Sequence, residues 1–227
     1  MTILRGFIHN MVLELVEEEK IILTIVHEYL NKNRQFTFEE ILPYINSRIR
    51  LSTTNISNEG VRKILKSLTN KKLIVEGSKL IKSEILNNDK RKEIYDFIVK
   101  NPGTYFNKIL RELNFSNHIV VWHLSMLLKF DFISKKILEN HEIYFDTTTE
   151  LEDLSSTYFT TKEKSQKIIK FLKKNSLGIT KTNFSQELNM HMNTLAKYLN
   201  LLENYNVIVK KKIDNKNLYF LSEKSTQ

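Results

Sequence analysis

One pattern of predicted elements occurs three times along the chain, and this repetition constrains the fold more than any other feature. Each copy places three amphipathic helices before two short β-prone runs that are joined by a turn. Residues 88–150 and 151–227 carry the pattern clearly, and residues 1–87 carry a looser copy. We therefore predict three tandem units with these bounds, in a fold that is mainly α with small β-hairpins.

The composition agrees with a helical fold and removes several other classes. Five glycines and two prolines among 227 residues leave little material for the tight turns of a β-sandwich or barrel. The chain has no cysteine, which excludes disulfides, zinc fingers, iron–sulfur clusters and thiol nucleophiles. With 41% hydrophobic and 27% charged residues, the composition is typical of soluble globular proteins.

The middle unit shows the pattern in its clearest form. Its predicted helices and strands lie at 90–100, 105–113, from Ser116 onward, 132–137 and 142–145. Val120, Leu124 and Leu127 fall at i, i+4 and i+7 of the third helix and mark the face that enters the core.

The last unit repeats these elements in the same order. They lie at 164–174, 182–188, from Asn193 onward, 207–211 and 218–221. Leu195, Leu199 and Leu202 mark the core face of its third helix.

The first unit departs most from the pattern. Its predicted helices and strands lie at 13–30, 38–45, from Ser57 onward, 73–75 and 80–81. Val61, Leu65 and Leu68 share one face of the third helix, and the segment before that helix is longer than in the other units. Its long first helix carries a wide apolar stripe, which is open to a dimer contact or to packing within the unit.

Two units resemble a known family. The middle unit does so through Arg91, Ile94, Tyr95, Asn101-Pro102-Gly103, Ile109, Leu113, Ser116, Val120 and His123-Leu124. The last unit does so through Leu188-Asn189-Met190, Asn193-Thr194-Leu195 and Tyr198-Leu199. Residues 91–221 are thereby similar to the winged-helix transcriptional regulators common in archaea. This resemblance implies winged helix-turn-helix units there, and the repeated pattern extends the prediction to three such units in tandem. Winged helices also serve as protein-binding modules.

Charge is distributed unevenly among the three units. Lysine plus arginine against aspartate plus glutamate number 13 and 10 in residues 1–87, 9 and 9 in 88–150, and 13 and 7 in 151–227. The net charges are +3, 0 and +6, which sum to the +9 of the whole chain. The last unit is therefore the best candidate for contact with a polyanion such as double-stranded DNA.

In a helix-turn-helix, the third helix enters the major groove, and the outward side chains of its first half reach the bases. In the last unit these side chains are His191, Asn193, Thr194, Lys197 and Tyr198. The predicted wing adds lysines for phosphate contact, namely Lys210, Lys211, Lys212 and Lys216. The alternative interpretation is that these residues form an ordinary solvated surface.

The third helices of the other two units differ from this one. In the first unit Arg62, Lys63 and Lys66 face outward beside Glu59, so DNA contact and a plain solvated helix both remain open. In the middle unit the third helix is apolar on several sides, and Val121, Trp122 and Met126 suit a protein interface better than a DNA-reading face. We expect this helix to pack against a neighbouring unit or a second subunit.

No catalytic or cofactor motif is present. His118 and His123 point about 140° apart on a helix, so they cannot share a metal, and His123 is expected to pack or hydrogen-bond. Phosphate-binding loops, nucleophile elbows and dinucleotide fingerprints are missing, so we expect neither enzymatic activity nor a cofactor. No run approaches the roughly 18 apolar residues of a membrane span, and no signal peptide is recognised. We therefore expect a cytoplasmic protein.

Two functions follow from these observations. The first is a dimeric, DNA-binding transcriptional regulator of tandem winged helices, with the last unit as the main DNA reader. The second is a tandem winged-helix scaffold that binds protein through its middle unit, as in membrane-remodelling or polymerase-associated complexes. An effector pocket between units is compatible with the first, although no set of residues identifies one.

Overall fold

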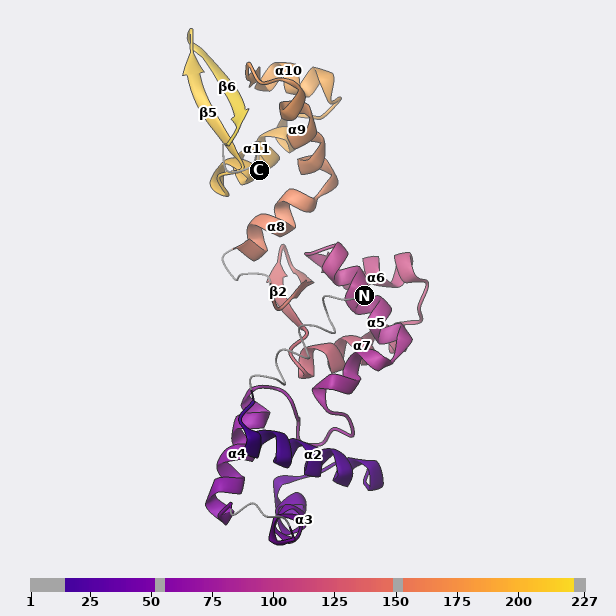
Figure 1. Ribbon diagram of the computed structural model, residues 1–227. Coiled ribbons are helices and arrows are strands. Elements are labelled where there is room, and N and C mark those ends of the chain that lie inside the picture. The colour runs from indigo at the N-terminus through magenta and orange to yellow at the C-terminus, as the bar shows by residue number, and fades with distance from the viewer. Residues whose placement is uncertain (1–14, 52–55, 149–152, 223–227) are drawn as a thin grey trace. The chain divides into compact units, whose positions relative to one another are not determined.

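A computed structural model describes residues 15–51, 56–148 and 153–222. These residues divide into two compact units, and each is described by itself. The first holds residues up to 96 together with 113–133, and the second holds 97–112 together with residues from 134 onward. This division passes through the predicted middle segment, 88–150. Figure 1 shows the order of the helices and strands along the chain.

The first of these compact units, called the first unit from here on, is built from helices. They are α2 (Glu17–Lys32), α3 (Phe38–Arg50), α4 (Asn58–Asn70), the 3-10 helix η1 (Lys82–Asn87), most of α5 (Asp89–Lys100) and α7 (Asn117–Lys129). The hydroxyl of Thr37 accepts a hydrogen bond from the backbone of Glu40, whose carboxylate accepts one from Thr37 in return. Ser57 caps α4 by accepting a hydrogen bond from the backbone N–H of Gly60.

Apolar faces of α2, α3 and α4 form the core of this unit. Val61, Leu65 and Leu68 are buried, as their spacing predicts. The stripe on α2 is also buried within the unit, at Ile22, Ile25, Val26 and Leu30 among others. The predicted first helix begins at residue 13, and its first two residues lie outside the described part of the chain. Because α2 uses its stripe internally, it offers little apolar surface for a dimer.

The predicted hairpin of the first unit is wrong. Residues 73–75 and 80–81 form bends and irregular chain instead of strands, and η1 follows them. Leu73, Ile74 and Ile81 are buried in the helical core, so their apolar character reflects core packing. The backbone N–H of Gly77 bonds to the carbonyl of Phe36 at 2.9 Å, which ties this loop to the segment before α3. The described residues of this unit therefore carry no wing after α4.

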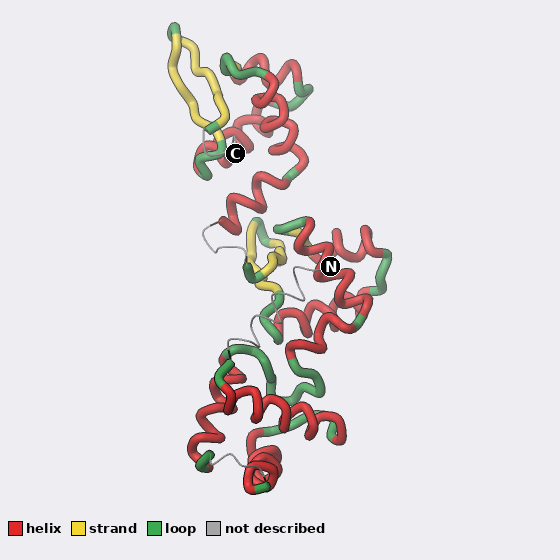
Figure 2. The backbone as a smooth tube through the Cα atoms, viewed as in Figure 1, coloured by secondary structure: helices red, strands yellow, loops and turns green. Residues whose placement is uncertain are grey.

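The second unit contains helices and all the described strands except Ile133 (Figure 2). Its elements are β1 (Thr104–Tyr105), α6 (Phe106–Leu113), β2 (Ile133–Leu138), β3 (His141–Asp146), α8 (Asp153–Thr161), α9 (Glu163–Lys174), β4 (Ile179–Thr180), α10 (Lys181–Glu187), α11 (Met192–Asn204), β5 (Ile208–Ile213) and β6 (Lys216–Leu221). The two predicted hairpins, β2–β3 and β5–β6, are present within one or two residues of their predicted bounds.

Each hairpin gains a short third strand that the sequence pattern did not predict. The sheets have the orders β1-β3-β2 and β4-β6-β5, and both short strands pair antiparallel with the last strand of their hairpin. Gly103 and Gly178 stand directly before them with positive φ of 79° and 80°, which glycine adopts without strain. The order from α9 to β6 is consistent with the winged-helix plan.

Helix α8 was also not predicted, and it joins the middle hairpin to α11. Ile143 and Phe145 of β3 share one apolar cluster with Leu154, Tyr158 and Phe159 of α8. Leu201 and Tyr205 of α11 pack against this cluster, where the rings of Phe159 and Tyr205 stack with centroids 5.3 Å apart. The residues on either side of position 150, a predicted boundary, therefore share one core.

Candidate nucleic-acid interface

Helix α11 is anchored with a defined orientation. Leu195, Leu199 and Leu202 are fully buried, which confirms the predicted core face. His191 precedes the helix, and its Nδ1 accepts a hydrogen bond of 3.3 Å from the backbone N–H of Asn193. This bond uses the Nδ1 lone pair, so Nε2 is the ring nitrogen left for an external ligand. The helix therefore presents its polar side away from its own core.

The predicted DNA-reading residues on α11 differ in exposure. His191, Asn193 and Lys197 are exposed, and Thr194 is half-buried. Tyr198 is also half-buried, because its ring packs against the core of the last winged-helix-like segment. Lys164 lies over that ring, with Nζ 5.9 Å from the centroid. The first half of α11 thus exposes two polar side chains and the His191 ring, with Thr194 and Tyr198 at the margin.

The hairpin after α11 extends with four exposed lysines, Lys210, Lys211, Lys212 and Lys216. Lys210 and Lys212 pair with Tyr219 and Asn217, whereas Lys216 pairs with Ile213. Because side chains alternate along a strand and paired residues share a face, Lys210 and Lys212 lie on one face. Lys211 and Lys216 lie on the other. The predicted cationic wing is therefore accessible, but its charge is divided between two faces.

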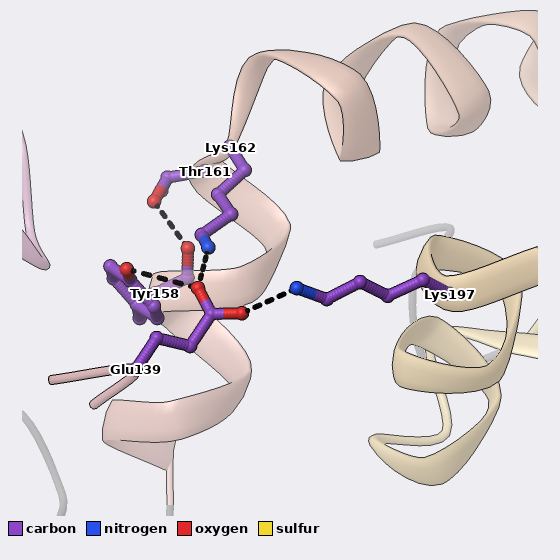
Figure 3. A network of polar contacts seen from close by, with 5 residues as sticks. All are labelled: Glu139, Tyr158, Thr161, Lys162 and Lys197. Atoms are coloured by element: carbon purple, nitrogen blue, oxygen red, sulfur yellow. Dashed lines mark hydrogen bonds and ion pairs between the residues drawn. The ribbon is translucent and has the colours of Figure 1, made fainter. Parts of the chain in front are cut away.

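A carboxylate from the middle hairpin lies beside α11 (Figure 3). Glu139, at the turn between β2 and β3, accepts a hydrogen bond of 3.0 Å on Oε1 from Lys197. Its Oε2 accepts one from Lys162, which stands just before α9, and a longer one of 3.5 Å from the Tyr158 hydroxyl. Thr161 completes the network by donating to the carbonyl of Tyr158 at 3.0 Å. Two cations, one on α11 and one at the junction of α8 and α9, therefore converge on one anion.

Titration at this network favours the charged forms. The hydrogen bond from Lys162 outweighs burial and, together with Lys197, holds the pKa of the Glu139 carboxyl below its usual value. Burial alone would lower the pKa of the Lys162 ammonium, but Glu139 and Tyr158 raise it above its usual value. Glu139 is therefore ionised at neutral pH, and the Lys162 ammonium beside it is charged.

The sequence interpretation did not identify Glu139 or Lys162. Glu139 fell in a turn expected to be solvated, and Lys162 lay outside every predicted element. Their contact depends on α8, a Ser- and Thr-rich helix that intrinsic propensity does not favour. Positive φ at Glu139 and Asn140 is typical of a tight hairpin turn, and this turn directs the carboxylate to α11.

The basic residues predicted on the first unit lie on α4. Arg62, Lys63 and Lys66 are all exposed. Lys63 is 3.9 Å from the carboxylate of Glu59, whose negative charge opposes phosphate binding. Arg62 borders a shallow depression whose other walls come from α3, including Leu42 and Arg50. These cations belong to the other compact unit from α11.

The predicted interface residues on α7 are largely accessible. Val121 is 53% and Trp122 54% exposed, and Met126 is half-buried. The guanidinium carbon of Arg91 lies 5.0 Å from the centre of the Trp122 ring, so the arginine covers one face of that ring. An exposed tryptophan held by a buried arginine is a pre-ordered apolar contact surface.

His123 packs inside the first compact unit, and a packing role is what the sequence predicts for this side chain. The ring is 4% exposed and lies 4.9 Å from that of Trp122, while its Nδ1 has no hydrogen-bond partner among the described residues. Burial, with the nearby charges of Arg91 and Lys90, lowers the pKa of His123 to about 4. The side chain is therefore neutral at physiological pH.

Two other kinds of site are absent from the described residues. No helix among them is both long and apolar enough to cross a membrane. No group of three or more histidine, aspartate or glutamate side chains in the same residues could hold a metal ion.

Comparison with known proteins gives one informative match. No protein-family description matches the chain. An uncharacterized HTH-type transcriptional regulator of Methanocaldococcus jannaschii is 31% identical to it over 145 residues. The matched region is 63% of this chain and 36% of that protein, so the chain spans little more than a third of its relative's length. The chain is thus similar in part to a protein named for a helix-turn-helix.

Proposed function

We propose that the protein is a DNA-binding transcriptional regulator of tandem winged helices that acts in the cytoplasm. The observation that carries this proposal is the exposed polar side of α11 beside a lysine-rich hairpin. The relative named as an HTH-type transcriptional regulator supports it. We also propose that the three predicted segments each supply one helix-turn-helix, with double-stranded DNA as the ligand.

In this proposal α11 lies in the major groove. His191, Asn193, Thr194 and Lys197 contact base edges, and Tyr198 contacts the margin of the groove. The wing lysines contact phosphates, which supply affinity without sequence information. On the other compact unit Arg62, Lys63 and Lys66 offer a second set of phosphate contacts.

The salt dependence of binding tests the wing. All four wing lysines on phosphates would contribute about −3.6 to the slope of log K against log salt, at about −0.9 per contact. Since the register divides them between two faces, we expect one pair to dominate and to contribute about −1.8.

The experiment measures fluorescence anisotropy of a labelled mixed-sequence duplex between about 50 and 200 mM salt. One variant changes Lys210 and Lys212 to Gln, and a second changes Lys211 and Lys216 to Gln. Lys170 and Lys173, exposed on α9, give a control with the same change of charge. The proposal fails if the wild-type slope is flat or if both wing variants behave like the control.

A second proposal concerns α7. Its exposed Val121 and Trp122 favour a contact with protein, and we propose that this contact forms a homodimer. The broader alternative is a scaffold that binds another protein at this surface, of the membrane-remodelling or polymerase-associated type. Sedimentation of Trp122→Ala tests the dimer, with Leu177→Ala, at an 89% exposed apolar residue, as control. A wild-type chain that sediments as a monomer contradicts the dimer.

A further inference from the structure

The contact of Glu139 with two lysines is an unusual arrangement for a DNA-reading helix. Lys197 stands at the centre of the outward side of α11, where a free cation would be most useful to a polyanion. Instead it is paired with an acid from the preceding hairpin. Lys162 is paired with the other oxygen of the same acid. Each lysine therefore has an anionic partner before any DNA arrives.

The geometry points to a phosphate site. We propose that Lys162 and Lys197 together bind one phosphate of the DNA backbone, and that Glu139 occupies this site in the free protein. A phosphate presents two charged oxygens to two cations as the carboxylate does, and the Tyr158 hydroxyl can donate to either. The inference rests on the proposed function, because it assigns a further contact to the same DNA interface.

The position of Glu139 allows a phosphate to displace its carboxylate from the two lysines. It lies at the tip of a two-residue turn, outside the paired strands, and its side chain is about one-third exposed. Two anions cannot share the site without strong repulsion, so a bound phosphate must displace the carboxylate. Lys162 is held independently of Glu139, because its ammonium also lies 4.6 Å from the centre of the Tyr158 ring and 5.2 Å from that of Phe159.

Removing the negative charge of Glu139 tests this competition. Glu139→Gln should bind the labelled mixed-sequence duplex about threefold to tenfold more tightly than the wild type, the gain expected from freeing two exposed ion pairs. The salt slope should steepen by about 0.9, the value for one added phosphate. If Glu139 instead positions Lys197 for DNA, the variant binds more weakly and the inference is overturned.

Glu142→Gln is the matched control. Glu142 lies on the same hairpin and pairs with a lysine, Lys135, at 2.6 Å, but that lysine is on the hairpin itself and the Glu142 side chain is more exposed than that of Glu139. Glu139→Gln and Glu142→Gln change the net charge by the same amount. Equal gains in affinity for the duplex would therefore reflect general electrostatic attraction to DNA and would refute the phosphate site. The double variant Glu139→Gln with Lys162→Gln should return to within about twofold of the wild type.

A titration with inorganic phosphate separates the site from the proposed function. NMR signals of the lysine side chains, assigned with Lys162→Gln and Lys197→Gln, should shift at lower phosphate concentration in Glu139→Gln than in the wild type or Glu142→Gln. If no protein binds duplex DNA, the proposed function fails while this titration still decides on the site. Identical titrations of the three proteins would overturn the inference.

Discussion

Acid should destabilise the first unit through His123, and the structure gives the size of the effect. The pKa of His123 in the folded chain is about 4, against an ordinary value of 6.5. Between these two values the unfolded chain binds a proton that the folded chain excludes, so stability falls as pH decreases from about 6.5 to about 4. At about 1.4 kcal/mol for each pKa unit, the loss reaches at most about 3.5 kcal/mol and is complete below about pH 4.

Urea unfolding at a series of pH values measures this loss. Trp122 is the only tryptophan of the chain and its ring lies against that of His123, so its fluorescence reports on this unit directly. His123→Gln removes the titrating group, and its stability should change less over the same range than that of the wild type. His118→Gln, at an exposed position of the same helix, is the control and should follow the wild type.

Equal losses of stability in the wild type and in His123→Gln between pH 6.5 and 4 would show that His123 does not cause the effect. Any other group that titrates in this range contributes equally to both proteins and cancels in the comparison. The difference between the two curves therefore isolates His123.

Two further predictions concern stability. Gly178→Ala should destabilise the last winged-helix-like segment by about 1–3 kcal/mol in thermal unfolding, because φ is +80° and a Cβ would lie 2.4 Å from Cζ of Phe220. Gly77→Ala, where φ is +71° but no atom lies within 4 Å of the added Cβ, should cost less, and equal losses would contradict the steric argument. Glu19→Gln should destabilise the first unit by about 1–3 kcal/mol in urea unfolding, since Glu19 is buried and binds Lys71 at 2.7 Å and Ser67 at 2.6 Å. Glu17→Gln, at an exposed pair, should change little.

Helical periodicity predicted the parts of the fold in which one face is buried. The core faces of α4, α7 and α11 were identified correctly, because leucine and valine at i, i+4 and i+7 lie on one face of a helix. The hairpins β2–β3 and β5–β6 were also found, since β-prone runs there flank polar turns.

The errors have physical causes. Residues 73–75 resemble a strand by composition, yet Leu73 and Ile74 are drawn into a helical core, where burial outweighs local preference. Strands β1 and β4 have two residues each, too short for any periodicity to reveal. Helix α8 forms because Leu154, Tyr158 and Phe159 find an apolar surface on other elements, and a single-sequence pattern does not contain that surface.

The candidate interface was predictable in its residues but not in its arrangement. The outward residues of α11 and the wing lysines follow from spacing alone. Their division between two faces depends on strand register, and the pairing of Lys197 with Glu139 depends on a contact between residues 58 positions apart. Information of that kind arises only when the chain has folded.

The apolar cluster around α8 has a consequence for dissecting this protein. A fragment that starts after residue 150 would keep Phe159, Leu201 and Tyr205 but lose Ile143 and Phe145, which cover them. Apolar surface would then be exposed to water beside α11, the helix whose DNA binding the fragment is meant to test. Such a surface favours self-association. A fragment that starts before β1 contains the whole sheet β1-β3-β2 and therefore keeps Ile143 and Phe145 in this cluster.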